Sequence, residues 1–299
     1  MAIGKRIASK NASALLGAAH KVARSMPALL QEARALAQSF MLGSLGQRKS
    51  GEGEGFWQFR PYIQGESLAR IDWRRSARDQ HIYLRERELG TVQTILLWVD
   101  QGYSMNYQST HAPYTKADYA TILCLILAEL FAKNGAPVGL PALLPPTTSR
   151  KATEQVALAL MKKEARMHFS PLHKVKPGAC FIMISDFLLN IDEIKAQLQP
   201  LYGQIVDAHF FHVVDPAERD FPFHGPTEFY HLETEESITL AQAQAYQKDY
   251  KCLYEDHSKS LKHFIESYGW HYETAPTDQA LSTLLLRFSQ RLQNKQVVR

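Results

Sequence analysis

The stretch "TILLWVD", Thr94 to Asp100, is an apolar run that ends abruptly in a carboxylate, with "QGYSM" directly after it. Branched and aromatic residues on both faces are typical of a buried strand in a parallel sheet. Two later stretches have the same form, "ACFIMISD" ending at Asp186 and "IVDAHFFHVVD" ending at Asp215. The repeated pattern predicts a layered α/β protein in which several buried strands end in aspartate.

Helical patterns lie between and after these strands. Helices are expected over residues 117–133, 151–166, 192–201, 240–268 and 279–295, with Thr239 as the cap of the fourth. The stretch "VVDPAERDFPF" predicts a turn and short hairpin, "WHYETA" a further strand, and "VGLPAL", which contains a proline, an edge strand. Strands that alternate with helices predict a mostly parallel sheet covered by helices on both faces.

The residues before the sheet divide into two parts. Residues 11–41 have the pattern of two amphipathic helices, with Ser25 as a cap and Pro27 in the first turn of the second. A loop rich in glycine and charge, "GSLGQRKSGEGEGF", follows them. The sequence therefore predicts a helical lead-in over residues 1–50, a motif segment packed on the core over 51–93, and an α/β domain over 94–299.

Composition excludes several classes of protein. With 299 residues and 45% hydrophobic content, the chain can form a sizeable core and is not disordered. The longest apolar stretch, from Thr121 to Ala132, contains Glu129 and is too short to cross a bilayer. The N-terminal residues form no continuous apolar core of a signal peptide. We therefore expect no membrane span and a cytoplasmic location.

Cysteine and histidine give little sign of a soft-metal site. The three cysteines lie far apart with no Cys-x-x-Cys pair, and we interpret them as small buried hydrophobes rather than as disulfide or zinc ligands. His209 and His212 are the most closely spaced histidine pair. Residues three apart on a strand point to opposite faces, so these two are not expected to share a metal.

The strand-end aspartates are the first candidates for a functional site. In open α/β sheets, ligands bind beyond the carboxyl ends of the strands, where Asp100 and Asp186 are expected to meet. Together with the hydroxyl of Ser104, and with Ser185 and Thr115 as helpers, they form an oxygen-rich set suited to Mg²⁺. The alternative is that each aspartate caps the helix after its strand.

The residue types around the first strand argue against familiar enzymes. A phosphatase of the haloacid dehalogenase type needs a second aspartate two residues after the first, and Gly102 stands there. The sequence contains no Gly-x-Ser-x-Gly elbow, and no Gly-x-Gly-x-x-Gly follows the first strand. We expect a protein that is not an enzyme, and a metal-dependent hydrolase using Asp100 and Asp186 stays open as an alternative.

A dense basic and aromatic motif precedes the sheet, within "FWQFRPYIQGESLARIDWRRSARDQHIYLRERE". Four arginines, Arg70, Arg74, Arg75 and Arg78, surround Trp73. Such a stretch can bind nucleic acid, which is one alternative. Carboxylates are interleaved with the arginines, however, and the net charge is only +4. An ion-pair scaffold or a protein-binding surface is therefore favoured, and no nucleic-acid partner is expected.

The same motif resembles a bacterial family, the domain of unknown function 58 group, whose members carry a von Willebrand factor A-like domain. The resemblance extends from residue 51 to the C-terminus and includes "YLRERE", "LLWVDQGYSM", "FIMISDF" and "VVDPAERDFP". The motif residues that carry it, in a structural or interaction role, are Gly65, Arg70, Ile71, Asp72, Trp73, Arg74, Ser76, Ala77 and Arg78.

The resemblance implies a fold and a partner. The fold is a Rossmann-like, three-layer sandwich of the von Willebrand factor A type with a mostly parallel sheet, here preceded by helices. Genes of this family typically neighbour MoxR-type AAA+ ATPases, and such pairs resemble chaperone-like systems that assemble or remodel a client protein. The resemblance thus implies a non-enzymatic adaptor that acts with a MoxR-type ATPase on an unknown client.

It also implies a metal site. In many A-domains an Asp-x-Ser-x-Ser triplet, a threonine and a later aspartate hold Mg²⁺, and an open coordination position accepts a partner's carboxylate. Asp100 and Ser104 match the ends of the triplet, and Gly102 replaces its middle serine. Asp186 resembles the later aspartate, and Thr115 is the candidate threonine. The expected site is a degenerate adhesion site.

Overall fold

The computed structural model describes residues 26–40, 56–61, 76, 83–87, 93–162, 178–202, 207–230 and 237–297. The chain forms two compact units, one of Met1–Gly43 with Gln93–Arg299 and the other of Ser44–Val92. The expected boundaries at residues 50 and 93 stay a prediction.

The smaller unit contains one antiparallel strand pair. Strand β1 (Phe56–Pro61) pairs with β2 (Tyr83–Arg87). Of the expected motif residues the structure describes only Ser76. Gly65, Arg70, Asp72, Trp73, Arg74 and Arg78 lie outside the described residues. The interpretations of this motif therefore stay predictions.

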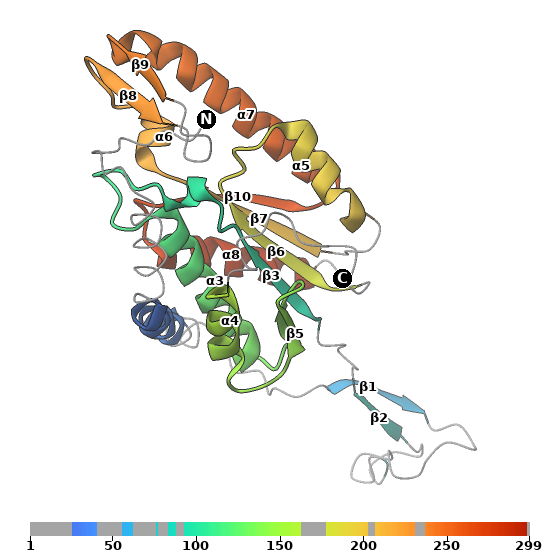
Figure 1. The fold of residues 1–299 in the computed structure, drawn as a ribbon. Coiled ribbons are helices and arrows are strands. Elements are labelled where there is room, and N and C mark those ends of the chain that lie inside the picture. The colour runs from blue at the N-terminus through green and yellow to red at the C-terminus, as the bar shows by residue number, and fades with distance from the viewer. Residues whose placement is uncertain are drawn as a thin grey trace. The chain divides into compact units, whose positions relative to one another are not determined.

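The larger unit is built on a six-stranded sheet (Figure 1). Its strands are β3 (Ile95–Val99), β4 (Val138–Leu140), β5 (Leu144–Thr147), β6 (Cys180–Ser185), β7 (Asp207–Val214) and β10 (His271–Pro276). Their spatial order is β10-β7-β6-β3-β4-β5, and only β5 is antiparallel to its neighbour. Counted along the chain this is the order 3-2-1-4-5-6 of a Rossmann-like sheet. The predicted mostly parallel sheet is confirmed.

Helices cover both faces of this sheet (Figure 1). One apolar cluster joins the sheet to α3 (Lys116–Lys133), α4 (Ala152–Leu160), α8 (Leu281–Val297) and a helix over residues 26–40. A second cluster joins the opposite face to α5 (Ile191–Leu198) and α7 (Gln247–Ser267). The result is a three-layer α/β sandwich with a mostly parallel sheet, as predicted, and its assignment to the von Willebrand factor A type stays a prediction.

Strand β7 shows why the strands are apolar on both faces. Phe211 and Val213 belong to the first cluster, while Ala208 and Phe210 belong to the second. Successive residues of a strand point to opposite faces, so a strand between two helical layers needs apolar side chains at nearly every position.

The helix over residues 26–40 belongs to the same core. Its buried residues, Met26, Leu29, Ala33 and Ala37, recur at helical spacing and pack in the first cluster. Pro27 lies in its first turn, where a missing amide costs little. The second of the two expected N-terminal helices is confirmed, and the first lies outside the described residues.

Three local predictions were wrong. The "VGLPAL" stretch does not form the edge strand: β4 is an inner strand that ends before Pro141, and the edge strand is β5, which contains Pro145 and Pro146. The turn after β7 includes a short helix, α6 (Pro216–Asp220), before a hairpin of β8 (Thr227–Tyr230) and β9 (Ser237–Leu240). Thr239 lies in β9 and does not cap the long helix.

Among the described residues, no helix has both the length and the hydropathy that crossing a membrane requires.

Replacement of Gly139 by alanine is expected to weaken the β4–β5 edge. An added Cβ would lie 2.8 Å from the Pro146 amide nitrogen and 2.9 Å from the Leu144 carbonyl oxygen. Both are backbone atoms of the neighbouring strand, so they cannot swing aside as a side chain would. We expect Gly139→Ala to lower the free energy of unfolding by about 1–3 kcal/mol in urea titrations. An unchanged value would contradict this close packing.

Candidate functional site

The two predicted aspartates lie where the strand order reverses. Strands β3 and β6 are neighbours, yet the chain leaves β3 toward one edge of the sheet and β6 toward the other. Such a switch point opens a crevice beyond the carboxyl ends of the strands. Asp100 follows β3 and Asp186 follows β6, and the Asp100 amide donates to the Ile184 carbonyl at 2.9 Å. The structure therefore brings the two carboxylates to one place.

Both carboxylate oxygens of Asp100 accept hydrogen bonds. Oδ1 accepts from the Gly102 amide at 2.8 Å, and Oδ2 accepts from the Ser185 hydroxyl at 2.6 Å. Burial and then the charge of Asp186 raise the pKa of Asp100, while these hydrogen bonds oppose the rise. Ser185, expected only as a helper, is thus a direct partner of Asp100.

Gly102 has a role in this arrangement. A Cβ at this position would lie 3.1 Å from Asp100 Oδ1 and 3.9 Å from Ser104 Oγ. The first distance is shorter than ordinary van der Waals contact, so the middle serine of an Asp-x-Ser-x-Ser triplet would press on the carboxylate. Glycine leaves the Asp100 carboxylate room to bond the amide of residue 102.

Asp186 lies deeper and faces a buried cation. Its Oδ2 accepts from Lys116 Nζ at 2.8 Å, its Oδ1 from the Leu188 amide at 3.4 Å, and the Ser104 hydroxyl also donates to it. Burial by itself raises the pKa of Asp186, but Lys116 and these hydrogen bonds hold it below its ordinary value. Ser104 therefore joins the site through Asp186.

Lys116 is the centre of the site. Its side chain is fully buried, and Nζ donates to Asp186 at 2.8 Å and to Glu218 Oε1 at 2.6 Å. Burial lowers the pKa of Lys116, but the two carboxylates raise it above its ordinary value, so the amine stays charged. The residue lies in the first turn of α3, where the helix dipole disfavours a cation. The two carboxylates offset that cost.

Glu218 reaches Lys116 because of the way α6 is capped. Asp215 Oδ1 accepts from the Ala217 amide at 2.8 Å, and Glu218 Oε2 accepts from the Asp215 amide at 3.2 Å, which is a capping box. Asp215 Oδ2 accepts from the Ser109 amide at 2.9 Å. Burial raises the pKa of Glu218 against the opposing effect of Lys116.

Helix capping explains one of the three strand-end aspartates. Asp215 caps α6, as the alternative interpretation predicted. Asp100 and Asp186 instead each accept an amide two residues further along, in the loop after the strand. Thr115 caps α3, because its Oγ1 accepts from the Asp118 amide at 2.9 Å. Its hydroxyl is therefore engaged beside the site.

The site as arranged does not fit the Mg²⁺ that the family resemblance implies. Both oxygens of Asp100 are engaged, Asp186 faces an ammonium, Gly102 offers no hydroxyl, and Thr115 caps a helix. Lys116 supplies the positive charge that a metal ion would bring. Magnesium binding stays a prediction.

His212 borders the site from β7. Its Nδ1 lies 2.6 Å from the Tyr272 hydroxyl, and its ring meets the ring of Phe187 edge-on. Burial lowers the pKa of His212 to about 4, with smaller effects of Lys116 and His257 in the same direction and of Asp186 in the other. The imidazole is therefore neutral at neutral pH.

His209 and His212 lie on opposite faces of β7, as predicted. The ring of His209 contacts Phe288 of α8, whereas His212 contacts Phe187 and Tyr272. These two histidines do not share a metal.

A family comparison matches this chain over most of its length. The sequence model of the family described as "Protein of unknown function DUF58" matches residues 58–260. The chain belongs to this family. The family resemblance seen in the sequence is thereby confirmed. No curated protein matches the chain.

Solved structures similar to this DUF58 chain include the conserved hypothetical protein BatB from Bacteroides thetaiotaomicron, at 15% sequence identity and a TM-score of 0.33. The match covers 66% of this chain and 99% of BatB.

Lys116 and Glu218 are not among the residues predicted from the sequence. One signal for Lys116 was present, because a basic residue in the first turn of a helix as apolar as α3 opposes the helix dipole. Glu218 stands three residues after Asp215, the spacing of a capping box. Neither signal shows that the two side chains meet, because 102 residues separate them.

Replacement of Lys116 by methionine is expected to destabilise the protein strongly. Asp186 and Glu218 would then be buried without a counterion, which typically costs about 3–5 kcal/mol. Urea or thermal unfolding measures the loss. Adding Asp186→Asn and Glu218→Gln to the same chain should restore much of it, because the uncompensated charges are then gone.

The matched control is Lys259→Met. Lys259 pairs with Glu255 at 3.1 Å on the surface of α7, where solvent screens the pair, so little change is expected. Equal effects of the two lysine substitutions would contradict the role given to Lys116.

His212 is expected to make stability depend on pH. Its folded pKa of about 4 lies below the ordinary 6.5, so between these values the unfolded chain binds a proton that the folded chain does not. Stability should therefore fall by about 3 kcal/mol as pH decreases from 6.5 to 4. Unfolding titrations across this range should show a shallower slope in His212→Gln. His263→Gln, at an exposed position of α7, is the control and should keep the slope of the parent.

Proposed function

We propose that this DUF58 protein is a non-enzymatic interaction protein that binds a MoxR-type AAA+ ATPase and acts with it in chaperone-like assembly or remodelling of a client. The observation that carries the proposal is the buried Lys116–Asp186–Glu218 network at the strand-end crevice. A general acid or base must be able to reach a substrate, and these groups instead satisfy one another. The network supports a binding surface better than a reaction centre.

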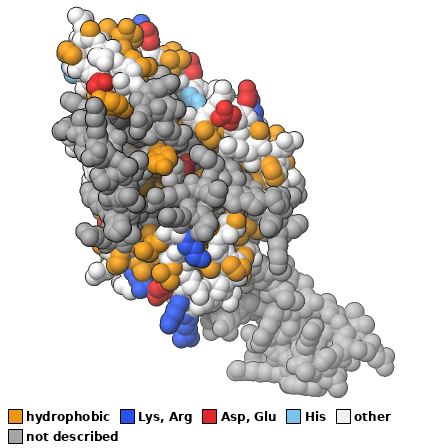
Figure 2. Space-filling model, in the orientation of Figure 1, with side chains coloured by type: hydrophobic (Ala, Val, Ile, Leu, Met, Phe, Trp, Pro, Cys, Tyr) orange, Lys and Arg blue, Asp and Glu red, His pale blue; other side chains and the backbone are white. Residues whose placement is uncertain are grey.

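Exposed hydrophobic side chains lie in the segments after β3 and β6. Tyr103 follows Gly102 and is 50% exposed, and Leu189 lies in the loop after Asp186 and is 38% exposed. Aromatic and aliphatic residues at such positions are typical anchors of protein interfaces. Hydrophobic, acidic and basic side chains are interspersed on the face shown in Figure 2. Tyr103 and Leu189 are the contact residues that we propose.

Hydrogen bonds hold the loops that carry Tyr103 and Leu189 in place. Asp100 bonds the Gly102 amide, and Ser185 Oγ accepts from the Phe187 amide at 3.1 Å. His257 of α7 lies with Nε2 2.8 Å from the Phe187 carbonyl, at a residue with φ of 47°. A surface ordered before binding loses less conformational entropy on association. The hydrogen bonds at the strand ends thus favour binding of a partner protein to these loops.

The identity of the partner rests on the family. The chain belongs to the DUF58 family, and the resemblance to this family implies genes that typically neighbour those of MoxR-type AAA+ ATPases. The carboxylate-accepting metal of an adhesion site does not fit the arrangement of Asp100, Asp186 and Lys116. We therefore propose recognition through the exposed anchors and the loop backbone rather than through a bridging Mg²⁺.

Co-purification of the full chain with a MoxR-type ATPase of the same organism tests the proposal. We expect binding in at least one of the ATP-analogue, ADP and nucleotide-free states, and no loss of binding when magnesium is chelated in the nucleotide-free state. Tyr103→Ala and Leu189→Ser should each weaken binding by about tenfold or more, the effect of removing an interface anchor. Leu158→Ser is the control, since Leu158 is 63% exposed on α4.

Two results would count against this function. One is the absence of binding in every nucleotide state. The other is turnover of phosphoesters that disappears in Asp186→Asn, which would favour the metal-dependent hydrolase instead.

A further inference from the structure

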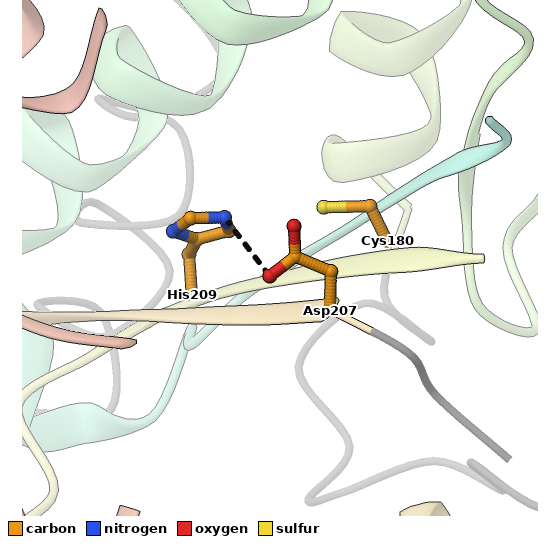
Figure 3. Close-up of side chains that lie close together, drawn as sticks. All are labelled: Cys180, Asp207 and His209. Carbon is orange, nitrogen blue, oxygen red and sulfur yellow. Dashed lines mark ion pairs between the residues drawn. The ribbon is translucent and has the colours of Figure 1, made fainter. Parts of the chain in front are cut away.

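A second group of polar side chains lies at the amino ends of the parallel strands, opposite the site around Lys116. Cys180 and Asp207 begin β6 and β7, His209 follows on β7, and His271 begins β10. Figure 3 shows the first three converging on one point above the sheet. These residues lie at the amino ends of the strands and take no part in the site around Lys116.

Strand register places these four residues on one face. Cys180 is paired with Asp207, and His209 is paired with His271. Asp207 and His209 are two residues apart on one strand, so their side chains point to the same side. His209 contacts Phe288 of α8, which identifies this side as the one covered by that helix.

The separations of the donor atoms suit a shared metal ion. His209 Nε2 lies 3.5 Å from Asp207 Oδ1, and His271 Nε2 lies 3.8 Å from the same oxygen. Donors around a tetrahedral zinc with bonds of about 2.0–2.3 Å are about 3.3–3.8 Å apart. The donors of Cys180, Asp207 and His209 all lie within 4.8 Å of one another. Donors that lie 4.8 Å apart need a shift of about 1 Å to reach that spacing.

One buried ring nitrogen of this group lacks a hydrogen bond. His209 is 3% exposed, and its Nε2 makes no hydrogen bond to any residue that the structure describes. Most buried polar atoms have a hydrogen-bond partner, and a buried atom that lacks one carries a cost in free energy. The ring of His209 is fixed by Phe288 on one side and by the stacked ring of His271 on the other, at centroid distances of 5.0 Å and 4.8 Å. A bound metal ion would satisfy this nitrogen.

We propose that Cys180, Asp207 and His209 form a binding site for Zn²⁺, with His271 beside it. A set of one sulfur, one oxygen and one nitrogen donor matches zinc, whereas Mg²⁺ prefers oxygen alone. The ion joins β6 and β7 at their amino ends, and His271 of β10 orients the stacked ring of His209. The side chain of His271 is 28% exposed and provides the entry path.

This site accounts for residues that the sequence analysis set aside. Cys180 was interpreted as a small buried hydrophobe, and His209 was considered only with His212. The partners of His209 are instead Asp207, two residues before it, and His271, on the neighbouring strand. The zinc site and the proposed interaction surface lie at opposite edges of the sheet, so failure of one leaves the other standing.

Cobalt and zinc titrations of the metal-stripped full chain test the site. We expect about one ion per chain, with the visible absorption of tetrahedral Co²⁺, a thiolate-to-cobalt charge-transfer band, and loss of both on addition of Zn²⁺. Cys180→Ala should remove the charge-transfer band. His271→Ala should weaken zinc binding at least about tenfold. Zinc should also raise the melting temperature of the parent chain but not that of the two variants.

Two matched variants serve as controls. Cys124→Ala replaces a buried cysteine of α3 outside the group, and His263→Ala replaces an exposed histidine of α7. Neither should change binding. The proposal is overturned if the parent chain binds no ion stoichiometrically, if the charge-transfer band survives Cys180→Ala, or if a control variant loses binding. Should Cys180→Ala fail to fold, the band in the parent chain and the effect of His271→Ala decide the matter.

Discussion

A lysine ammonium buried between two carboxylates joins three parts of this protein that are distant in sequence. Lys116 begins the central helix α3, Asp186 follows the inner strand β6, and Glu218 belongs to the short helix after β7. None of the three charges is stable alone in the interior, because a buried ion without a partner is strongly destabilising. The carboxyl edge of the sheet therefore depends on their meeting, and the loops above it take their positions from this network.

The network also sets the chemical character of the strand-end crevice. A sheet of this strand order collects polar side chains at the switch point, where the family resemblance implies a metal site. Here the chain supplies its own cation. Gly102 lets the Asp100 carboxylate turn toward the backbone, where it holds a loop. The polar side chains at the carboxyl ends of β3 and β6 thus hold the loops that carry the exposed Tyr103 and Leu189.

The two ends of the parallel strands carry different kinds of polar side chain. Oxygen donors and an ammonium meet at the carboxyl edge, whereas sulfur, nitrogen and a single carboxylate meet at the amino edge. Parallel strands in register produce both groups, because each strand contributes side chains at the same height to the same face. The apolar middle of β6 lies between the two groups. The proposed interaction surface and the proposed zinc site therefore do not interfere with one another.

The sequence by itself determined the α/β class, the inner strands, most helix positions and the family, because apolar periodicity and a dense local motif are properties of neighbouring residues. It also indicated that Asp100 and Asp186 would meet, since parallel strands end at a common edge. Only the tertiary structure decided that Lys116 occupies that meeting place, that the edge strand is β5, and that His209 faces Asp207 and His271. These facts depend on strand register and on side chains up to 102 residues apart, and local pattern does not encode either.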